Sequence, residues 1–185
     1  MCIRITLIFE NIYDEVSINS VAKSYDRRFK IVNNPIILSQ LPDGERWFES
    51  AYSSCECSTG IGSFELFTRN VENVIEQLKD KSIAEEVRTE EVKRKSMYKK
   101  DVDNWGEFIK SLIRKYNFKR VGLLMHFTDD DLARADFLIL DKYVVKYSDI
   151  NPEVLMKIKN ELYIILWIIK LVKAKQIKVR NIREG

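Results

Sequence analysis

The chain has 185 residues, which suits one folded domain with a sizeable hydrophobic core. Hydrophobic side chains make up 45% and charged side chains 32% of the chain, a composition typical of globular proteins rather than disordered or fibrous ones. The 31 basic and 28 acidic residues leave a net charge of +3, too small a surplus to indicate a surface built for polyanions.

Three features predict a cytoplasmic protein that does not enter membranes. The first ten residues alternate and include Arg4 and Glu10, so they lack the long apolar stretch of a signal peptide. The longest apolar run, residues 162–169, is far shorter than the roughly 20 residues that cross a bilayer. Three cysteines, an odd number, argue against a secreted disulfide framework.

The first third of the chain shows strand and helix patterns in turn. Residues 2–9 alternate and are rich in β-branched types, which predicts a strand. Five apolar residues then recur at helical spacing, with Ser17 as the expected N-cap. They are Ile18, Val21, Ala22, Tyr25 and Phe29. A short strand at 36–38 and a longer one at 47–57 flank the turn at 42–44, which predicts a hairpin.

The middle of the chain favours helix. Glycine and proline are absent from residues 63–105, as expected of a continuous helix. Apolar stripes occur at 71–78 and 105–116, whereas residues 79–103 between them are charge-dense and only weakly periodic. We therefore predict that residues 79–103 form either a protruding helical hairpin or an inserted segment.

The last third again mixes strands and helices. Residues 121–127 predict a buried strand, and residues 137–147 predict one long or two short strands. Asn151-Pro152-Glu153 is a strong helix start, and the apolar stripe that follows predicts a long C-terminal helix reaching about Lys173. Taken together, the elements predict a single α+β domain over residues 1–185, with a mixed, mostly antiparallel sheet packed against helices.

The three cysteines and the single histidine are candidate metal ligands. Cys55 and Cys57 lie two positions apart on a predicted strand, so their thiols face the same side and could chelate zinc. Cys2 and His126 would complete a Cys3His site only if their two strands are antiparallel neighbours. The alternative is that the cysteines are small core residues without further chemistry.

A glycine-containing stretch, Ser58-Thr59-Gly60-Ile61-Gly62-Ser63, follows the cysteine pair and precedes the predicted long helix. Backbone N–H groups in such a loop can hold a phosphate, helped by a helix N-terminus. The candidate ligand-binding residues are Ser58, Thr59, Gly60, Gly62 and Ser63. Neither a Walker A motif nor a dinucleotide fingerprint is present, and the alternative is that the glycines only let the chain turn out of the sheet.

The sequence contains no complete catalytic signature and no motif that identifies a family. Because the chain has one histidine, any Ser–His or Cys–His pair would have to use His126. We therefore expect a non-catalytic binding or regulatory protein of inhibitor or immunity type, with a protein or a small phosphorylated ligand as partner and nucleic acid as a weaker alternative. The other hypotheses are a thiol- or zinc-dependent enzyme centred on Cys55, Cys57 and His126, and a nucleotide-phosphate binder that uses residues 58–63.

Overall fold

The computed structural model describes residues 2–10, 14–41, 45–50, 59–128, 139, 141–156 and 162–167. The strands are β1 (Cys2–Glu10), β2 (Phe29–Ile31), β3 (Glu45–Ser50), β4 (Arg120–Thr128), β5 (Asp141–Lys146) and β6 (Leu162–Trp167). The helices are α1 (Glu15–Ala22), α2 (Pro35–Leu38), α3 (Gly60–Gln77), α4 (Lys81–Tyr116) and α5 (Pro152–Leu155), with 3-10 turns η1 (Lys23–Tyr25) and η2 (Tyr147–Asp149). The predicted α+β class is confirmed.

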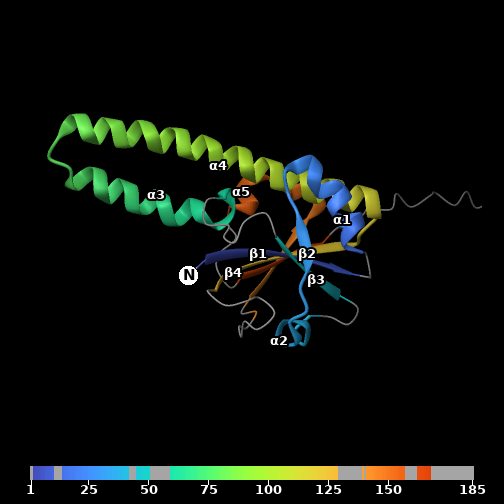
Figure 1. The fold of residues 1–185 in the computed structure, drawn as a ribbon. Coiled ribbons are helices and arrows are strands. Elements are labelled where there is room, and N and C mark those ends of the chain that lie inside the picture. Colours follow the sequence, from blue (N-terminus) through green and yellow to red (C-terminus); the bar gives the residue numbers. More distant parts are fainter. Residues whose placement is uncertain are drawn as a thin grey trace, which may run out of the picture.

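The six strands form one sheet in the order β2-β3-β1-β4-β6-β5. All neighbouring pairs are antiparallel except β5 and β6, which run parallel. Helices α1 and α4 lie on one face of the sheet and α2 lies on the other (Figure 1). Alternate residues of β1 divide between the two cores: Ile5 and Leu7 pack under α1 and α4, and Ile8 packs with Ile37 of α2.

The helix predicted from Ile18 to Phe29 is shorter than its apolar spacing suggests. It starts at Glu15, capped by Asp14 rather than Ser17, because the Ser17 N–H donates to Asp14 Oδ1 at 2.6 Å. It ends at Ala22 and passes through η1 to Asp26, which adopts a left-handed conformation (φ 54°). Phe29 then begins β2, so its place in the apolar series reflects a shared core and not a shared helix.

The strand predicted at residues 36–38 is wrong, because these residues form α2. Asn34 caps this helix by accepting hydrogen bonds from the N–H groups of Ile36 (2.9 Å) and Ile37 (3.2 Å), and Pro35 occupies its first turn. Instead, β3 pairs with β2 on one edge and with β1 on the other. Of the second predicted strand, 47–57, residues 51–57 lie outside the described part of the chain.

The prediction of a long C-terminal helix is also wrong within the described residues. The helix begins as predicted, with Asn151 Oδ1 accepting from the Val154 N–H at 3.0 Å, but it ends at Leu155. Residues 162–167 form β6, which lies between β4 and β5. A continuous apolar run of this length fits a two-sided buried strand as well as a helix, and pairing on both edges decides for the strand.

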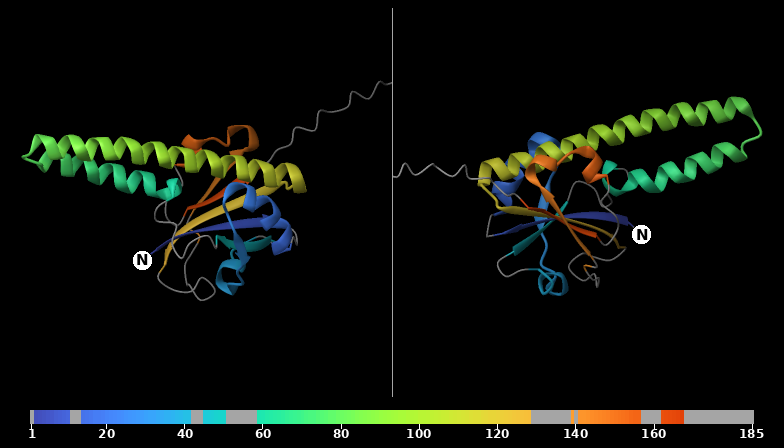
Figure 2. Two further views of the ribbon diagram at one scale, coloured as in Figure 1. Left: turned by 45° about the horizontal axis from the view of Figure 1, so that its top comes forward. Right: turned by 180° about the vertical axis from the view of Figure 1, so that it is seen from behind.

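Helices α3 and α4 fold back on each other through a turn at residues 78–80, so the predicted continuous helix is interrupted there. Asp80 caps α4 by accepting from the Ser82 N–H at 2.8 Å. We call α3 together with residues 81–101 of α4 the arm. The arm extends well beyond the sheet in all views (Figures 1 and 2).

Candidate functional site

The second half of α4 belongs to the sheet core, whereas its first half does not. Trp105, Phe108, Ile109 and Leu112 are fully buried in the core formed with β1 and β4. In the arm, the buried residues of α4 are Ala84, Glu91 and Tyr98, which are seven residues apart. This is the heptad spacing of a coiled coil, so the arm is a narrow antiparallel pair of helices held by one seam.

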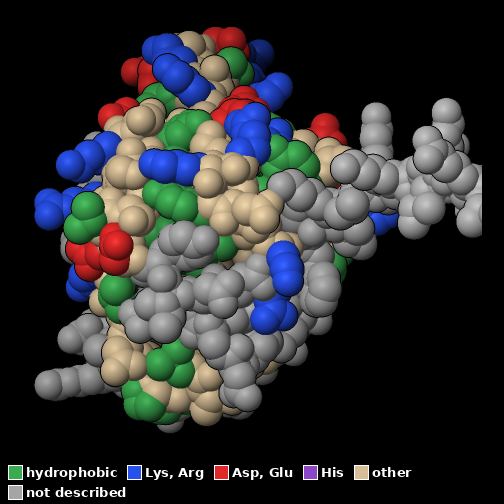
Figure 3. Space-filling model, turned by 90° about the vertical axis from the view of Figure 1, so that its right-hand side faces the viewer, with side chains coloured by type: hydrophobic (Ala, Val, Ile, Leu, Met, Phe, Trp, Pro, Cys, Tyr) green, Lys and Arg blue, Asp and Glu red, His purple; other side chains and the backbone are tan. Residues whose placement is uncertain are grey.

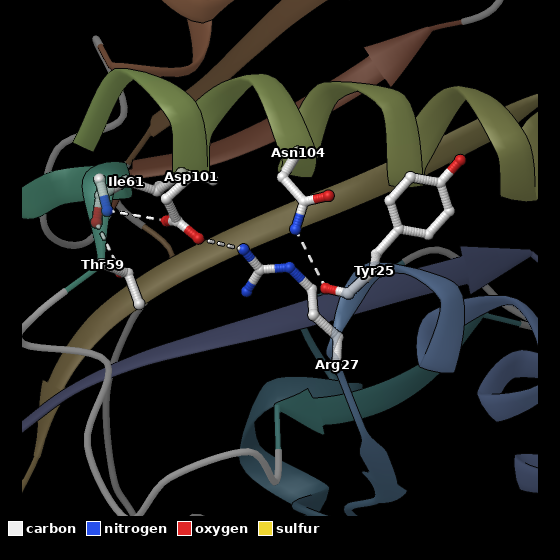
Figure 4. A network of polar contacts seen from close by, with 7 residues as sticks. Tyr25, Arg27, Thr59, Ile61, Asp101 and Asn104 are labelled. Carbon is white, nitrogen blue, oxygen red and sulfur yellow. Dashed lines mark hydrogen bonds and ion pairs between the residues drawn. The ribbon is translucent and has the colours of Figure 1, made fainter. Parts of the chain in front are cut away.

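The base of the arm is joined to the sheet domain by an ion pair between a buried arginine and a partly exposed aspartate (Figure 4). Arg27, which is 5% exposed and follows η1, donates from Nη2 to Asp101 Oδ1 at 2.6 Å. The other oxygen of Asp101 accepts from the Gly60 N–H at 2.8 Å. The Arg27 guanidinium lies 3.7 Å from the ring centre of Trp105, a cation–π geometry. One carboxylate therefore connects α4, the first residue of α3 and the segment before β2.

Two further hydrogen bonds fix α4 against η1. Asn104 Nδ2 donates to the Tyr25 carbonyl oxygen at 3.0 Å. The hydroxyls of Tyr25 and Ser111 are 2.5 Å apart. Together with the Arg27–Asp101 pair, these contacts set the direction in which the arm leaves the sheet, because they restrain α4 over several consecutive turns.

Gly60, the first residue of α3, packs closely against α4. A Cβ atom at this position would lie 2.3 Å from the Tyr98 carbonyl oxygen and 2.5 Å from Val102 Cγ2. Because two of the nearest atoms belong to the backbone of α4, a side chain cannot be accommodated by a simple rotamer change. The glycine is therefore explained by close helix packing.

The predicted phosphate loop is shorter in the structure than in the sequence analysis. Ser58 lies outside the described residues, and Gly60, Gly62 and Ser63 belong to the first turn of α3. Thr59 precedes the helix, and its hydroxyl donates to the Ile61 carbonyl oxygen at 3.5 Å. The Gly60 N–H faces the carboxylate of Asp101, so a phosphate bound there would have to displace an anion of the chain itself.

The strand order that the Cys3His hypothesis needs is present. β1 and β4 are antiparallel neighbours, with Cys2 opposite Thr128 and Arg4 opposite His126. Cys55 and Cys57 lie outside the described residues. Within the part of the chain that the structure describes, no group of three or more His, Cys, Asp or Glu side chains is placed to hold a metal ion. Zinc binding by this chain stays a prediction.

A scan against family models, a search of curated proteins and a search of solved structures each found no match. Among the described helices, none has the length and apolarity needed to cross a membrane.

A groove of about 230 Å³ runs between the two helices of the arm, and we call it the arm groove. It is lined by Val71, Glu86, Val87, Glu90, Glu91 and Arg94. Glu91 is 7% exposed although it occupies a seam position, and within the described structure its Oε2 has no hydrogen-bond partner. Its basic neighbours Arg94 and Lys95 lie at long ion-pair distances of 3.9 Å and 3.8 Å. Sequence reasoning missed this site because a charged residue at a seam position interrupts the apolar repeat.

Hydrogen bonds and burial shift the pKa values of several groups in the arm. The Lys93 ammonium donates to Glu90 Oε1 at 2.6 Å, which lowers the pKa of Glu90 and raises that of Lys93. Hydrogen bonds from the Ser82 hydroxyl and backbone N–H lower the pKa of Asp80. Burial in the seam raises the pKa of Tyr98. At neutral pH, Glu90, Lys93 and Asp80 are therefore charged and the Tyr98 phenol is protonated.

Large apolar side chains are exposed along the arm. Met97 is 70%, Val92 68%, Val74 49% and Ile83 47% exposed. Ile83, Glu90 and Met97 are seven residues apart and so lie along one row of α4. Because Glu90 lines the arm groove, this row follows the edge of the groove.

Replacing Glu91 by leucine is expected to stabilise the protein by about 1 kcal/mol, because a buried carboxylate with only distant ion pairs gives way to an apolar seam residue. Urea unfolding, with hydrogen exchange of the arm amides, measures the effect. Glu85→Leu is the control, since Glu85 lies on the exposed side of the same helix. A clear loss of stability in Glu91→Leu would show instead that the carboxylate has a stabilising role.

Proposed function

We propose that this protein is a non-catalytic binding protein and that the arm is the element through which it contacts a partner protein. The proposal rests on the projection of the arm. The arm extends past the sheet instead of lying over the core on the helix-covered face (Figures 1 and 2). In α4, residues 102–113 supply the side chains buried in that core, and among the described side chains of the arm Ile61 joins it. A projecting helix pair that exposes Met97 can present this side chain to a groove on a partner.

The charge pattern of the arm supports the same proposal. Residues 92–100 contain five basic side chains and no acidic one, whereas residues 71–91 contain seven acidic and three basic side chains. At the opposite end of the molecule, basic, acidic and hydrophobic side chains are interspersed among the described residues (Figure 3). Segregated charge of this kind orients a partner and speeds its association.

Photo-crosslinking in the source cells tests the proposal. A photoreactive amino acid at Met97 is expected to give one discrete protein adduct, because this side chain is 70% exposed on the proposed contact surface. The control is Val16 of α1, which is 79% exposed and lies away from the arm. Equal adducts at both positions, or none at Met97, would contradict the proposal.

A further inference from the structure

We propose that the partner of the arm is a second copy of this chain, bound antiparallel along the arm groove about a two-fold axis. The inference rests on the proposed function of the arm and names its partner. Three observations support it: the charge polarity of the arm, the exposed Met97 beside a groove with two valines in its wall, and the length of the arm beyond the ion pair at its base.

The charge polarity is self-complementary only in the antiparallel orientation. The outer segment, residues 71–91, carries four more acidic than basic side chains, and residues 92–100 carry five basic side chains. Two arms side by side and parallel would place like charges together. Two antiparallel arms place the acidic segment of each beside the basic segment of the other, which favours association and fixes the orientation.

The free length of the arm sets the register. Residues 81–101 of α4 run from the turn to the ion pair at the base, so the midpoint lies at residue 91. Full overlap of two antiparallel arms therefore puts the two-fold axis close to this residue. An axis at residue 92, one residue from this midpoint, places Glu90 of one copy level with the partner's Arg94, and symmetry makes the same pair a second time.

The same register brings an exposed apolar side chain to the groove. With Glu90 level with the partner's Arg94, Met97 lies level with the partner's Val87, which lines the arm groove together with Val71. Met97 and Glu90 share one row of α4, so the charged and apolar contacts lie on the same flank. A flexible methionine suits a groove of about 230 Å³ with two valines in its wall.

Val92, another exposed apolar residue of α4, lies on a different flank. It is two residues from Glu90, and at roughly 100° per residue it points about 200° away around the helix. Val92 and Met97 have nearly the same exposure, 68% and 70%. They therefore form a matched pair for testing which flank is the interface.

Sedimentation equilibrium of the full chain across a wide concentration range is the test, with charge-reversal variants as probes. The wild-type chain is expected to form dimers. Glu90→Arg and Arg94→Glu each place like charges together twice in the symmetric dimer, so each is expected to weaken dimerisation roughly 100-fold. Mixing the two variants restores both ion pairs, and a heterodimer is expected to form. Met97→Ser is expected to weaken dimerisation at least tenfold, and Val92→Ser to leave it unchanged.

The inference would be overturned if the wild-type chain is monomeric at every concentration. It would also be overturned if Glu90→Arg and Arg94→Glu do not weaken dimerisation, or if mixing them does not restore it. Circular dichroism shows whether each variant is folded. The mixing experiment is a second control, because two misfolded variants would not dimerise when they are combined. If the chain is monomeric but Met97 still crosslinks to another protein, the second copy is the wrong partner and the proposed function stands. If binding appears only with added nucleic acid and vanishes with salt, residues 93–100 bind phosphates instead.

Discussion

Replacing Asp101 by alanine is expected to lower the free energy of unfolding by about 3 kcal/mol. The substitution leaves the guanidinium of Arg27, which is 5% exposed, without its 2.6 Å ion pair, and it removes the acceptor of the Gly60 N–H. This value is at the lower end of the stability losses seen when one partner of a buried ion pair is removed, because Asp101 itself is 29% exposed and partly solvated. Urea unfolding measures the global effect, and hydrogen exchange of the α3 amides measures the local one.

A double-mutant cycle with Arg27→Met separates the ion pair from other losses. The double variant is expected to lose much less unfolding free energy than the sum of the two single variants. With both side chains replaced, no charged partner is left buried without its counter-charge. Asp103→Ala, an exposed aspartate one half-turn further along α4, is the control and is expected to change stability by less than about 0.5 kcal/mol. If Asp101→Ala behaves like Asp103→Ala, the pair does not anchor the arm.

The ion pair between Arg27 and Asp101 explains how the arm can project from the sheet and still keep a fixed direction. The described seam residues of α4 are Ala84, Glu91 and Tyr98, and the charged residue at the central position weakens their packing, so contacts at the base of the arm help to hold its two helices together. Asp101 makes these contacts, because it pairs with Arg27 and accepts from the Gly60 N–H where α3 begins and α4 enters the sheet core. Binding of a second copy along the arm groove, as proposed above, would add apolar contact beside Val71 and Val87.

Patterns within one element predicted the fold well where local sequence decides the structure. Strand β4 follows from its apolar run, and the start of α5 follows from Asn151-Pro152. The failures occur where tertiary pairing overrides the local pattern. Phe29 fits the helical spacing of α1 but joins a strand, and residues 162–167 fit a helix but lie between two strands.

The candidate site was harder to predict than the fold, because its parts are distant in sequence. Arg27 and Asp101 are 74 residues apart, and no local pattern indicates that they meet. The sequence around Gly60 predicts a turn or a phosphate-binding loop, whereas in the structure Gly60 packs against the backbone of Tyr98. The arm groove is not predicted from the sequence, because a charged residue such as Glu91 is expected on an exposed helix face and not in a buried seam.

Replacing Gly60 by alanine is expected to destabilise the protein by about 3 kcal/mol, at the upper end of the cost of overpacking. Alanine is the better helix former by about 1 kcal/mol, so propensity alone would predict a gain. The packing cost outweighs that gain because the new Cβ would lie 2.3 Å from the Tyr98 carbonyl oxygen, and α3 can relieve the contact only by moving away from α4.

Gly106→Ala is the matched control, because Gly106 is also a helical glycine near another element. Its added Cβ would lie 3.6 Å from Leu155 Cδ1, an ordinary contact, so helix propensity should prevail and stability should rise. Thermal unfolding of both variants, with and without inorganic phosphate, distinguishes two roles for Gly60. A loss of stability independent of phosphate identifies close helix packing. Unchanged stability with a lost phosphate-induced shift would identify a phosphate cradle instead, and would require Asp101 to release the Gly60 N–H.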